Sequence, residues 1–150
     1  MDNGDKACEL CTAAGGVLLW ESPCCRIVRV MDAQYPGFCR VIWTAHVREM
    51  TDLPVEQQQA LMQVVFAVEA VVRALFQPHK INLASFGNMV PHMHWHIIPR
   101  WLDDQHFPEP IWGAAQRAGR AARPVVDDAT LSQALARALA TVVTRTGNPS

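Results

Sequence analysis

The sequence has almost no net charge, no long apolar run and no even set of cysteines. Its 13 Lys and Arg residues nearly balance its 14 Asp and Glu residues, and the formal net charge is −1. This balance argues against a broad electrostatic surface for nucleic acid or for membranes. No unbroken apolar stretch reaches the roughly 18 residues of a transmembrane helix, and residues 1–6 are too polar to begin a signal peptide. We therefore expect a cytoplasmic protein with no nucleic-acid partner and no membrane partner.

The cysteine content excludes a fold held together by disulfides. The chain has five cysteines, of which Cys24 and Cys25 are adjacent, and an odd set of this kind does not form a disulfide framework. In a reducing compartment such residues are thiols, metal ligands or small core residues. With 150 residues, of which 50% are hydrophobic and 18% are charged, the chain is long enough for one globular domain and too short for two.

The most informative stretch reads His-Met-His-Trp-His-Ile-Ile and begins at His92. A period of two is the period of a β-strand, so the pattern predicts that His92, His94 and His96 share one face while the large apolar residues occupy the other. Neighbouring imidazoles on that face would lie roughly 6.5 Å apart. We expect Pro91 and Pro99 to bound the strand, because proline cannot serve a central ladder.

Imidazole can act as a nucleophile, a general acid or a metal ligand. Three merely solvated histidines are disfavoured, because histidine is not a favoured strand residue. One interpretation is a metal site, since His-x-His on a strand can place two ligands. All three side chains span about 13 Å, too far to reach one ion. The other interpretation is covalent catalysis at phosphorus, with the middle imidazole, His94, as the attacking group.

The rest of the chain alternates between short β-type runs and two helical patterns. Runs rich in β-branched and large apolar residues predict strands at residues 17–20, 25–31, 38–43 and 80–86. Apolar residues at helical spacing predict a long helix from Asp52 to Phe76, and a capping-box pattern at Thr130 predicts a final amphipathic helix. We expect a tight turn at Gly87 and Asn88 to join strand 80–86 to the histidine strand.

The amino terminus carries a Cys-x-x-Cys motif formed by Cys8 and Cys11. A single pair of this kind is a weak signal, because it is compatible with half of a zinc site, with a redox pair or with no function. A thioredoxin-like interpretation lacks the strand before the motif and the helical pattern after it.

The histidine stretch matches the pattern of the histidine triad (HIT) family, His-φ-His-φ-His-φ-φ with φ apolar, at every position. Residues 37–46 resemble the family's second strand and end in His46, and residues 87–91 resemble the segment before the triad. Residues 103–113 are similar to a bacterial branch labelled diadenosine tetraphosphate hydrolase-like.

The resemblance implies an α+β fold: a five-stranded antiparallel sheet with one long helix across it and a C-terminal helix. We expect a single domain over residues 1–150, with a core at about 8–113 and a C-terminal helical extension at 114–150. The family pairs such subunits, so we also expect a homodimer.

The resemblance completes the metal hypothesis. In zinc-carrying members, the Cys-x-x-Cys pair acts with the histidine that closes the second strand and with the first triad histidine. The corresponding residues here are Cys8, Cys11, His46 and His92, a Cys₂His₂ set suited to a closed structural zinc site. Such a site would tie the amino terminus to the histidine strand.

The resemblance also implies a nucleotide hydrolase. His94 would attack the α-phosphorus of a dinucleoside polyphosphate or of a nucleoside phosphoramidate, and water would hydrolyse the covalent nucleotidyl-histidine. His96 would hydrogen-bond the phosphate or the leaving group, and His92 would orient the site or bind zinc. The scheme requires no catalytic metal. The alternatives are a metal-dependent hydrolase that uses the His-x-His strand as ligands, and a nucleotide-binding sensor that does not turn over.

Nucleotide contacts are expected from Asp32, Asn82 and Asn88. Asp32 resembles the family's ribose-binding acid, although it also fits a turn-initiating residue, and Asn82 matches a position near the family's active site. Asn88 and Met89 stand where the family has Gln and Ser or Thr. Because methionine cannot replace a hydroxyl, this departure favours the sensor. Trp112 is expected to serve mainly in packing.

Overall fold

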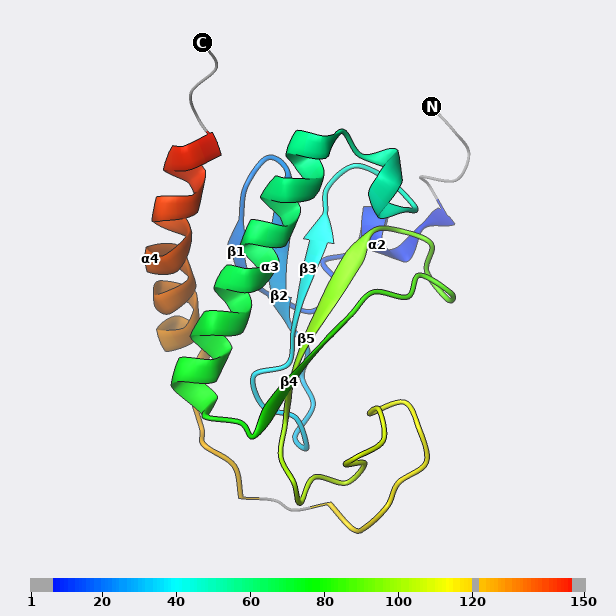
Figure 1. Cartoon of the computed structure of the whole chain (residues 1–150), viewed down its shortest axis with the longest axis vertical. Coiled ribbons are helices and arrows are strands. Elements are labelled where there is room, and N and C mark those ends of the chain that lie inside the picture. Colours follow the sequence, from blue (N-terminus) through cyan, green and yellow to red (C-terminus); the bar gives the residue numbers. More distant parts are fainter. Residues whose placement is uncertain (1–6, 120–121, 147–150) are drawn as a thin grey trace.

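The computed structural model describes residues 7–119 and 122–146, so the polar start at residues 1–6 lies outside the described residues. Figure 1 shows a sheet with two long helices beside it and an extended segment below it. The elements in chain order are α2 (Glu9–Thr12), β1 (Val17–Glu21), β2 (Cys25–Arg29), β3 (Cys39–Trp43), the 3₁₀ helix η1 (Met50–Asp52), α3 (Val55–Phe76), β4 (Lys80–Ala84), β5 (His94–Arg100) and α4 (Asp128–Thr146).

The five strands form one antiparallel sheet in the order β1-β2-β3-β5-β4. This confirms the predicted α+β architecture. The histidine strand β5 lies between β3 and β4, where backbone ladders on both sides fix its position. On β3, Arg40 is paired with His96 and Ile42 with His94.

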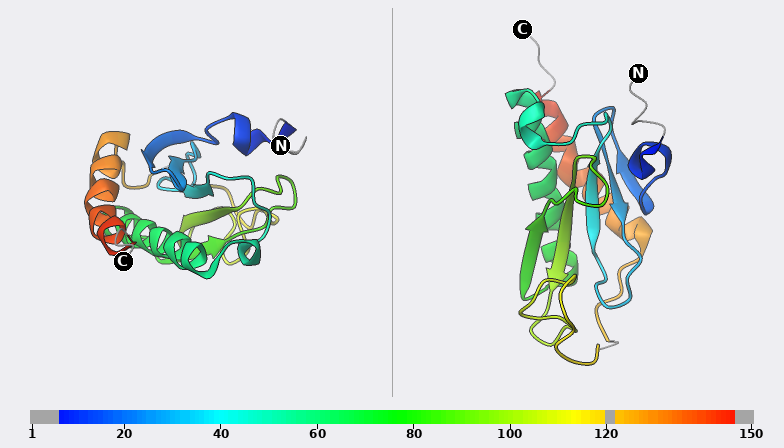
Figure 2. Two further views of the ribbon diagram at one scale, coloured as in Figure 1. Left: turned by 90° about the horizontal axis from the view of Figure 1, so that it is seen from above. Right: turned by 90° about the vertical axis from the view of Figure 1, so that its right-hand side faces the viewer.

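Helices α3 and α4 lie on one side of the sheet and α2 lies on the other, as the two views of Figure 2 show. By length and composition α3 could cross a membrane, but it is the core helix of this fold, because its apolar face is buried against the sheet. The alternating apolar residues of β5 pack on this side, and so do three leucines of α4: Leu131, Leu135 and Leu139. The helical extension therefore shares the core of the domain.

The histidine strand begins and ends later than predicted. The last pair with β3 joins Ile42 to His94, and β5 therefore begins at His94. Pro99 lies inside β5, paired with Ile81 of β4. The ladder with β3 ends at Ile97, so at Pro99 the strand has a neighbour on one side only, a position that tolerates proline.

Two predicted boundaries are wrong for local reasons. Residues 85–93 form a long loop between β4 and β5, in place of the expected tight turn. Helix α4 begins at Asp128, before Thr130, because the Asp127 carboxylate accepts a hydrogen bond from the Thr130 N–H at 2.7 Å and thus caps the helix.

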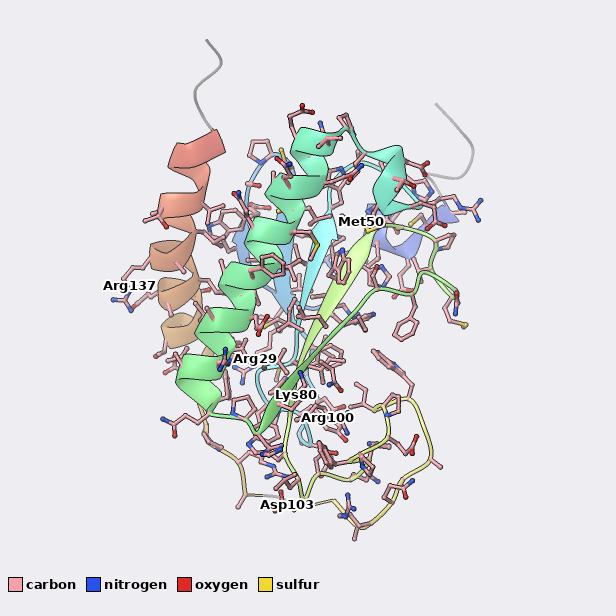
Figure 3. The ribbon with its side chains drawn as sticks, viewed as in Figure 1. Arg29, Met50, Lys80, Arg100, Asp103 and Arg137 are labelled. Atoms are coloured by element: carbon pink, nitrogen blue, oxygen red, sulfur yellow. The ribbon has the colours of Figure 1, made fainter. Side chains whose placement is uncertain are left out.

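A buried ion pair fastens the segment after β5 to the sheet. The Arg100 guanidinium donates to Asp104 at 2.8 and 3.1 Å, and the two residues are 2% and 1% exposed. The Tyr35 hydroxyl lies 3.1 Å from Asp104 and 2.6 Å from Nδ1 of His106. Figure 3 places Arg100 where β5 meets this segment. Trp112 lies further along the same segment, with its ring centroid 5.0 Å from that of His96.

Candidate functional site

A cavity of about 430 Å³ opens at His94 and His96, on the face of the sheet opposite α3. Its wall combines β3, β5, the loop 85–93 and the segment after β5. The remaining lining residues are Arg40, Phe86, Gly87, Asn88, Met89, Val90 and Trp112. This volume is in the range of small-molecule sites.

A backbone carbonyl fixes the tautomer of His94. Its Nδ1 lies 2.6 Å from the carbonyl oxygen of His92, and a carbonyl can only accept, so Nδ1 carries the proton. In the neutral ring, Nε2 then holds the lone pair. His94 is only 9% exposed and lies on an interior strand. An imidazole held in the tautomer whose Nε2 carries the lone pair is a prepared nucleophile.

His96 lies next to His94 along the strand, with ring centroids 4.9 Å apart and the rings nearly perpendicular. This is closer than the spacing expected from strand geometry. Burial, followed by the nearby His94 and Arg40, lowers the pKa of His96 to about 3, so its ring is neutral at pH 7. Its Nδ1 is buried without a hydrogen-bond partner among the described residues.

Aromatic rings surround His96. Trp112 and Phe86 lie 5.0 and 6.3 Å from it between ring centroids, and they meet each other edge to face at 5.0 Å. Both are about half exposed, at 53% and 56%. Trp112 therefore lines the cavity, a role beyond the packing expected from sequence.

A second cluster gathers Cys8, Cys11, His46 and His92, as predicted, and their ligand atoms all lie within 4.8 Å of one another. The sulfur of Cys11 is 3.4 Å from Nδ1 of both histidines, and that of Cys8 is 3.5 Å from Nδ1 of His92. With metal–sulfur and metal–nitrogen bonds of about 2.3 and 2.0–2.1 Å, a tetrahedral zinc site separates S and N ligands by about 3.5 Å. The residues present fit a metal ion.

His92 belongs to the cysteine–histidine cluster and does not line the cavity at His94 and His96. Its Nε2 lies 2.6 Å from the Trp43 carbonyl and must donate to it, which leaves the lone pair of Nδ1 for a metal. Burial lowers the pKa of His92, which favours the neutral, ligating form. His92 was predicted either to orient the site or to bind zinc, and different parts of the residue serve these two roles. Its ring faces the cysteines, and its backbone carbonyl orients His94.

The three residues expected to bind nucleotide lie in different places. Asn88 lines the cavity. Asp32 accepts a hydrogen bond from the Gln34 N–H at 2.9 Å, the contact of a turn-initiating residue. Asn82 accepts from Arg100 at 2.7 Å and is not among the cavity's lining residues. A ribose contact by Asp32 and an active-site role for Asn82 remain predictions.

Sequence reasoning missed Arg40 and Phe86. Arg40 is the single cation in the apolar strand β3, a signal visible in the sequence. The position of Phe86 depends on the long loop 85–93, which the expected tight turn concealed.

Comparison with known proteins finds a matching family model and a curated relative. The model of the HIT domain family matches residues 14–102. The AP-4-A phosphorylase of Mycobacterium tuberculosis is 28% identical over 85 residues, or 53% of this chain and 44% of that protein. The matched part therefore spans about half the length of the curated relative.

Solved structures share the fold over most of this chain. The histidine triad protein blr8122 from Bradyrhizobium japonicum is 29% identical with a TM-score of 0.65, over 83% of this chain and 90% of that chain. A histidine triad protein from Marinobacter aquaeolei VT8 is 28% identical with a TM-score of 0.63, over 89% and 93% of the two chains.

Proposed function

Because the chain belongs to the HIT domain family, we propose that it is a nucleotide hydrolase that acts at the α-phosphorus through a covalent nucleotidyl-histidine. The observation that carries this proposal is the hydrogen bond from Nδ1 of His94 to the His92 carbonyl, because it holds the Nε2 lone pair ready beside a cavity. The likeness to AP-4-A phosphorylase supports a dinucleoside polyphosphate as substrate.

The reaction has two displacements. The lone pair of His94 Nε2 forms a bond to the α-phosphorus, and the bond from phosphorus to the leaving group breaks with its electron pair on that group. Water then attacks the same phosphorus and releases a proton to the solvent, and the electron pair of the P–N bond returns to Nε2. Dividing one difficult displacement into two easier ones is the gain of covalent catalysis. His96 offers a hydrogen bond to a phosphate oxygen.

We also propose that Cys8, Cys11, His46 and His92 hold a structural zinc ion. A closed Cys₂His₂ set leaves no open position for substrate and contributes to folding. The cluster joins α2 to the residue whose carbonyl orients His94, so the metal would act on catalysis only through the position of His92. This arrangement disfavours a metal-dependent hydrolase built on all three histidines, since only His92 belongs to the cluster.

The proposed assembly is a homodimer in the cytoplasm. The edge strand β4 provides an open ladder for pairing with a second copy, and the five free cysteines fit a reducing compartment. Light scattering on the purified protein tests the dimer, and a mass equal to one chain contradicts it.

Turnover of diadenosine tetraphosphate in ¹⁸O-labelled water tests the function. Attack at the α-phosphorus predicts AMP and ATP, with the label in AMP, and no turnover by His94→Ala. Release of ADP alone indicates attack at an inner phosphorus and contradicts the proposal. The appearance of ADP in place of AMP when inorganic phosphate is added identifies a transferase that uses the same intermediate. Binding without turnover supports the sensor.

A further inference from the structure

The cavity wall contains a cation that the two-histidine scheme does not use. Arg40 of β3 lines the cavity with His94 and His96. Its backbone partner across the ladder is His96, whereas His94 is paired with Ile42. The backbone of Arg40 therefore lies in the same row of the sheet as His96, one row away from His94.

The hydrogen bonds of Arg40 are incomplete. Its Nη1 donates to the Gly15 carbonyl at 3.1 Å, but its Nε is buried and has no partner in the described part of the chain. Burial lowers the pKa of Arg40, and the Glu9 carboxylate raises it. No described ion pair joins Arg40 to an acid. A partly desolvated cation that lines a cavity and belongs to no described ion pair is suited to an anion.

The rest of the wall offers little else to an anion. Among the residues that the structure describes, Arg40 is the single charged side chain lining the cavity. Asn88 supplies an amide, and Met89 supplies no donor. The charge of a bound polyphosphate must therefore be met mainly by Arg40.

Building on the proposed function, we propose that Arg40 binds the phosphate of the leaving group, and that the site consequently favours phosphoric anhydrides over phosphoramidates. In an in-line attack the nitrogen and phosphorus begin roughly 3 Å apart, which places the next phosphorus of an anhydride roughly 6 Å from the nitrogen. Successive rows on one face of a strand are about 6.5 Å apart. The row of Arg40 and His96 thus matches the position of the second phosphate.

The chemistry of the leaving group agrees with this assignment. When the P–O bond of an anhydride breaks, the electron pair stays on the bridging oxygen, and the departing phosphate carries the negative charge. A guanidinium stabilises that charge without transferring a proton. An amine leaving group requires a proton when the P–N bond breaks, and His96 is neutral near pH 7 because its pKa is about 3.

The test compares kcat/KM for diadenosine tetraphosphate and for an adenosine phosphoramidate with a neutral amine leaving group. For Arg40→Met we expect a loss of roughly 10–150-fold on the anhydride, the range for a charged hydrogen bond, and a loss below about 3-fold on the phosphoramidate. Arg40→Lys keeps the charge and should recover part of the anhydride rate. Thermal melts of both variants check that they fold.

Arg26→Met is the matched control. Arg26 lies on the same face and donates to the carbonyls of Leu10, Ala13 and Ala14, so it holds the same N-terminal segment as Arg40 without lining the cavity. A purely structural role predicts equal losses on both substrates, as expected for Arg26→Met. Equal losses in Arg40→Met, or no loss, overturn the assignment to the leaving group while the proposed function stands. A wild-type protein inactive on both substrates overturns both proposals.

Discussion

Replacing Asp104 with asparagine should detach the segment that carries Trp112. The Asp104 carboxylate is 1% exposed and receives six hydrogen bonds. Two come from Arg100 and one from Tyr35, and three come from the backbone N–H groups of Trp101, His106 and Phe107. Asparagine keeps the shape but has only one acceptor oxygen, so it leaves the Arg100 charge buried and uncompensated.

Two lines of reasoning give the magnitude. Breaking one side of a buried ion pair costs about 3–5 kcal/mol. Burial by itself raises the pKa of Asp104, but hydrogen bonds from Arg100 and from the backbone outweigh it and lower the pKa from 3.8 to about 2, a shift equivalent to about 2 kcal/mol. We expect a loss of about 3–5 kcal/mol for Asp104→Asn, or roughly 6–20 °C in Tm for a chain of this length.

Urea unfolding at pH 7 and pH 3 measures the effect and its sign. Because the folded-state pKa is depressed, the stabilisation is complete above the ordinary pKa of 3.8 and is lost as the pH falls toward about 2. The difference between wild type and Asp104→Asn should therefore shrink by roughly 1 kcal/mol at pH 3.

Asp103→Asn is the control. Its side chain is 40% exposed and pairs with Arg123 at 2.8 Å, so its loss should cost less than about 1 kcal/mol. A cost below about 1 kcal/mol for Asp104→Asn would contradict a stabilising buried ion pair. A difference between Asp104→Asn and wild type that is the same at pH 7 and at pH 3 would contradict the depressed pKa of Asp104.

Three further predictions concern the metal, a turn and a proton. Cys11→Ser should remove the zinc, about one ion per chain, by elemental analysis, whereas Cys24→Ser, at an exposed cysteine outside the cluster, should retain it; full zinc in Cys11→Ser would contradict the site. Gly37→Ala should cost about 1–3 kcal/mol in urea unfolding, because Gly37 has φ +88° and a Cβ there would lie 2.7 Å from the Phe76 ring. Gly87→Ala, with φ +72° but no atom nearer than 3.7 Å, should cost less, and the opposite order would be inconsistent with this packing. An NMR titration of His96 should show no midpoint between pH 5 and 8, because burial, His94 and Arg40 lower its pKa to about 3; a midpoint near 6.5 would show that the ring is not desolvated.

Periodicity was enough to predict the strands and which face of β5 meets the core. Alternation along a strand is a local property, so spacing alone predicts which side chains share a face. Trp95 and Ile97 lie in the core, and His94 and His96 line the cavity. The strand ends do not follow in this way. They depend on where the ladder with β3 stops, and this partner is more than fifty residues away in the sequence.

Only part of the candidate site could be predicted, because the rest depends on contacts between residues that are far apart in the sequence. The four candidate metal ligands emerged from the Cys-x-x-Cys motif together with the family resemblance. The placement of the His92 ring beside the cysteines did not, because it depends on the Trp43 carbonyl fixing one ring nitrogen. The proximity of Arg40 to the site follows only from its pairing with His96, which depends on the tertiary structure.

Mass spectrometry of the protein during turnover tests directly whether His94 forms a covalent nucleotidyl intermediate. The protein is mixed with diadenosine tetraphosphate and quenched within seconds under alkaline denaturing conditions, in which a P–N bond to histidine survives. We expect one adenylyl group on the peptide that contains His94, and none in His94→Ala. The adduct should disappear with time as water completes the reaction. Turnover by the wild type with no adduct, or an adduct that persists in His94→Ala, would contradict it.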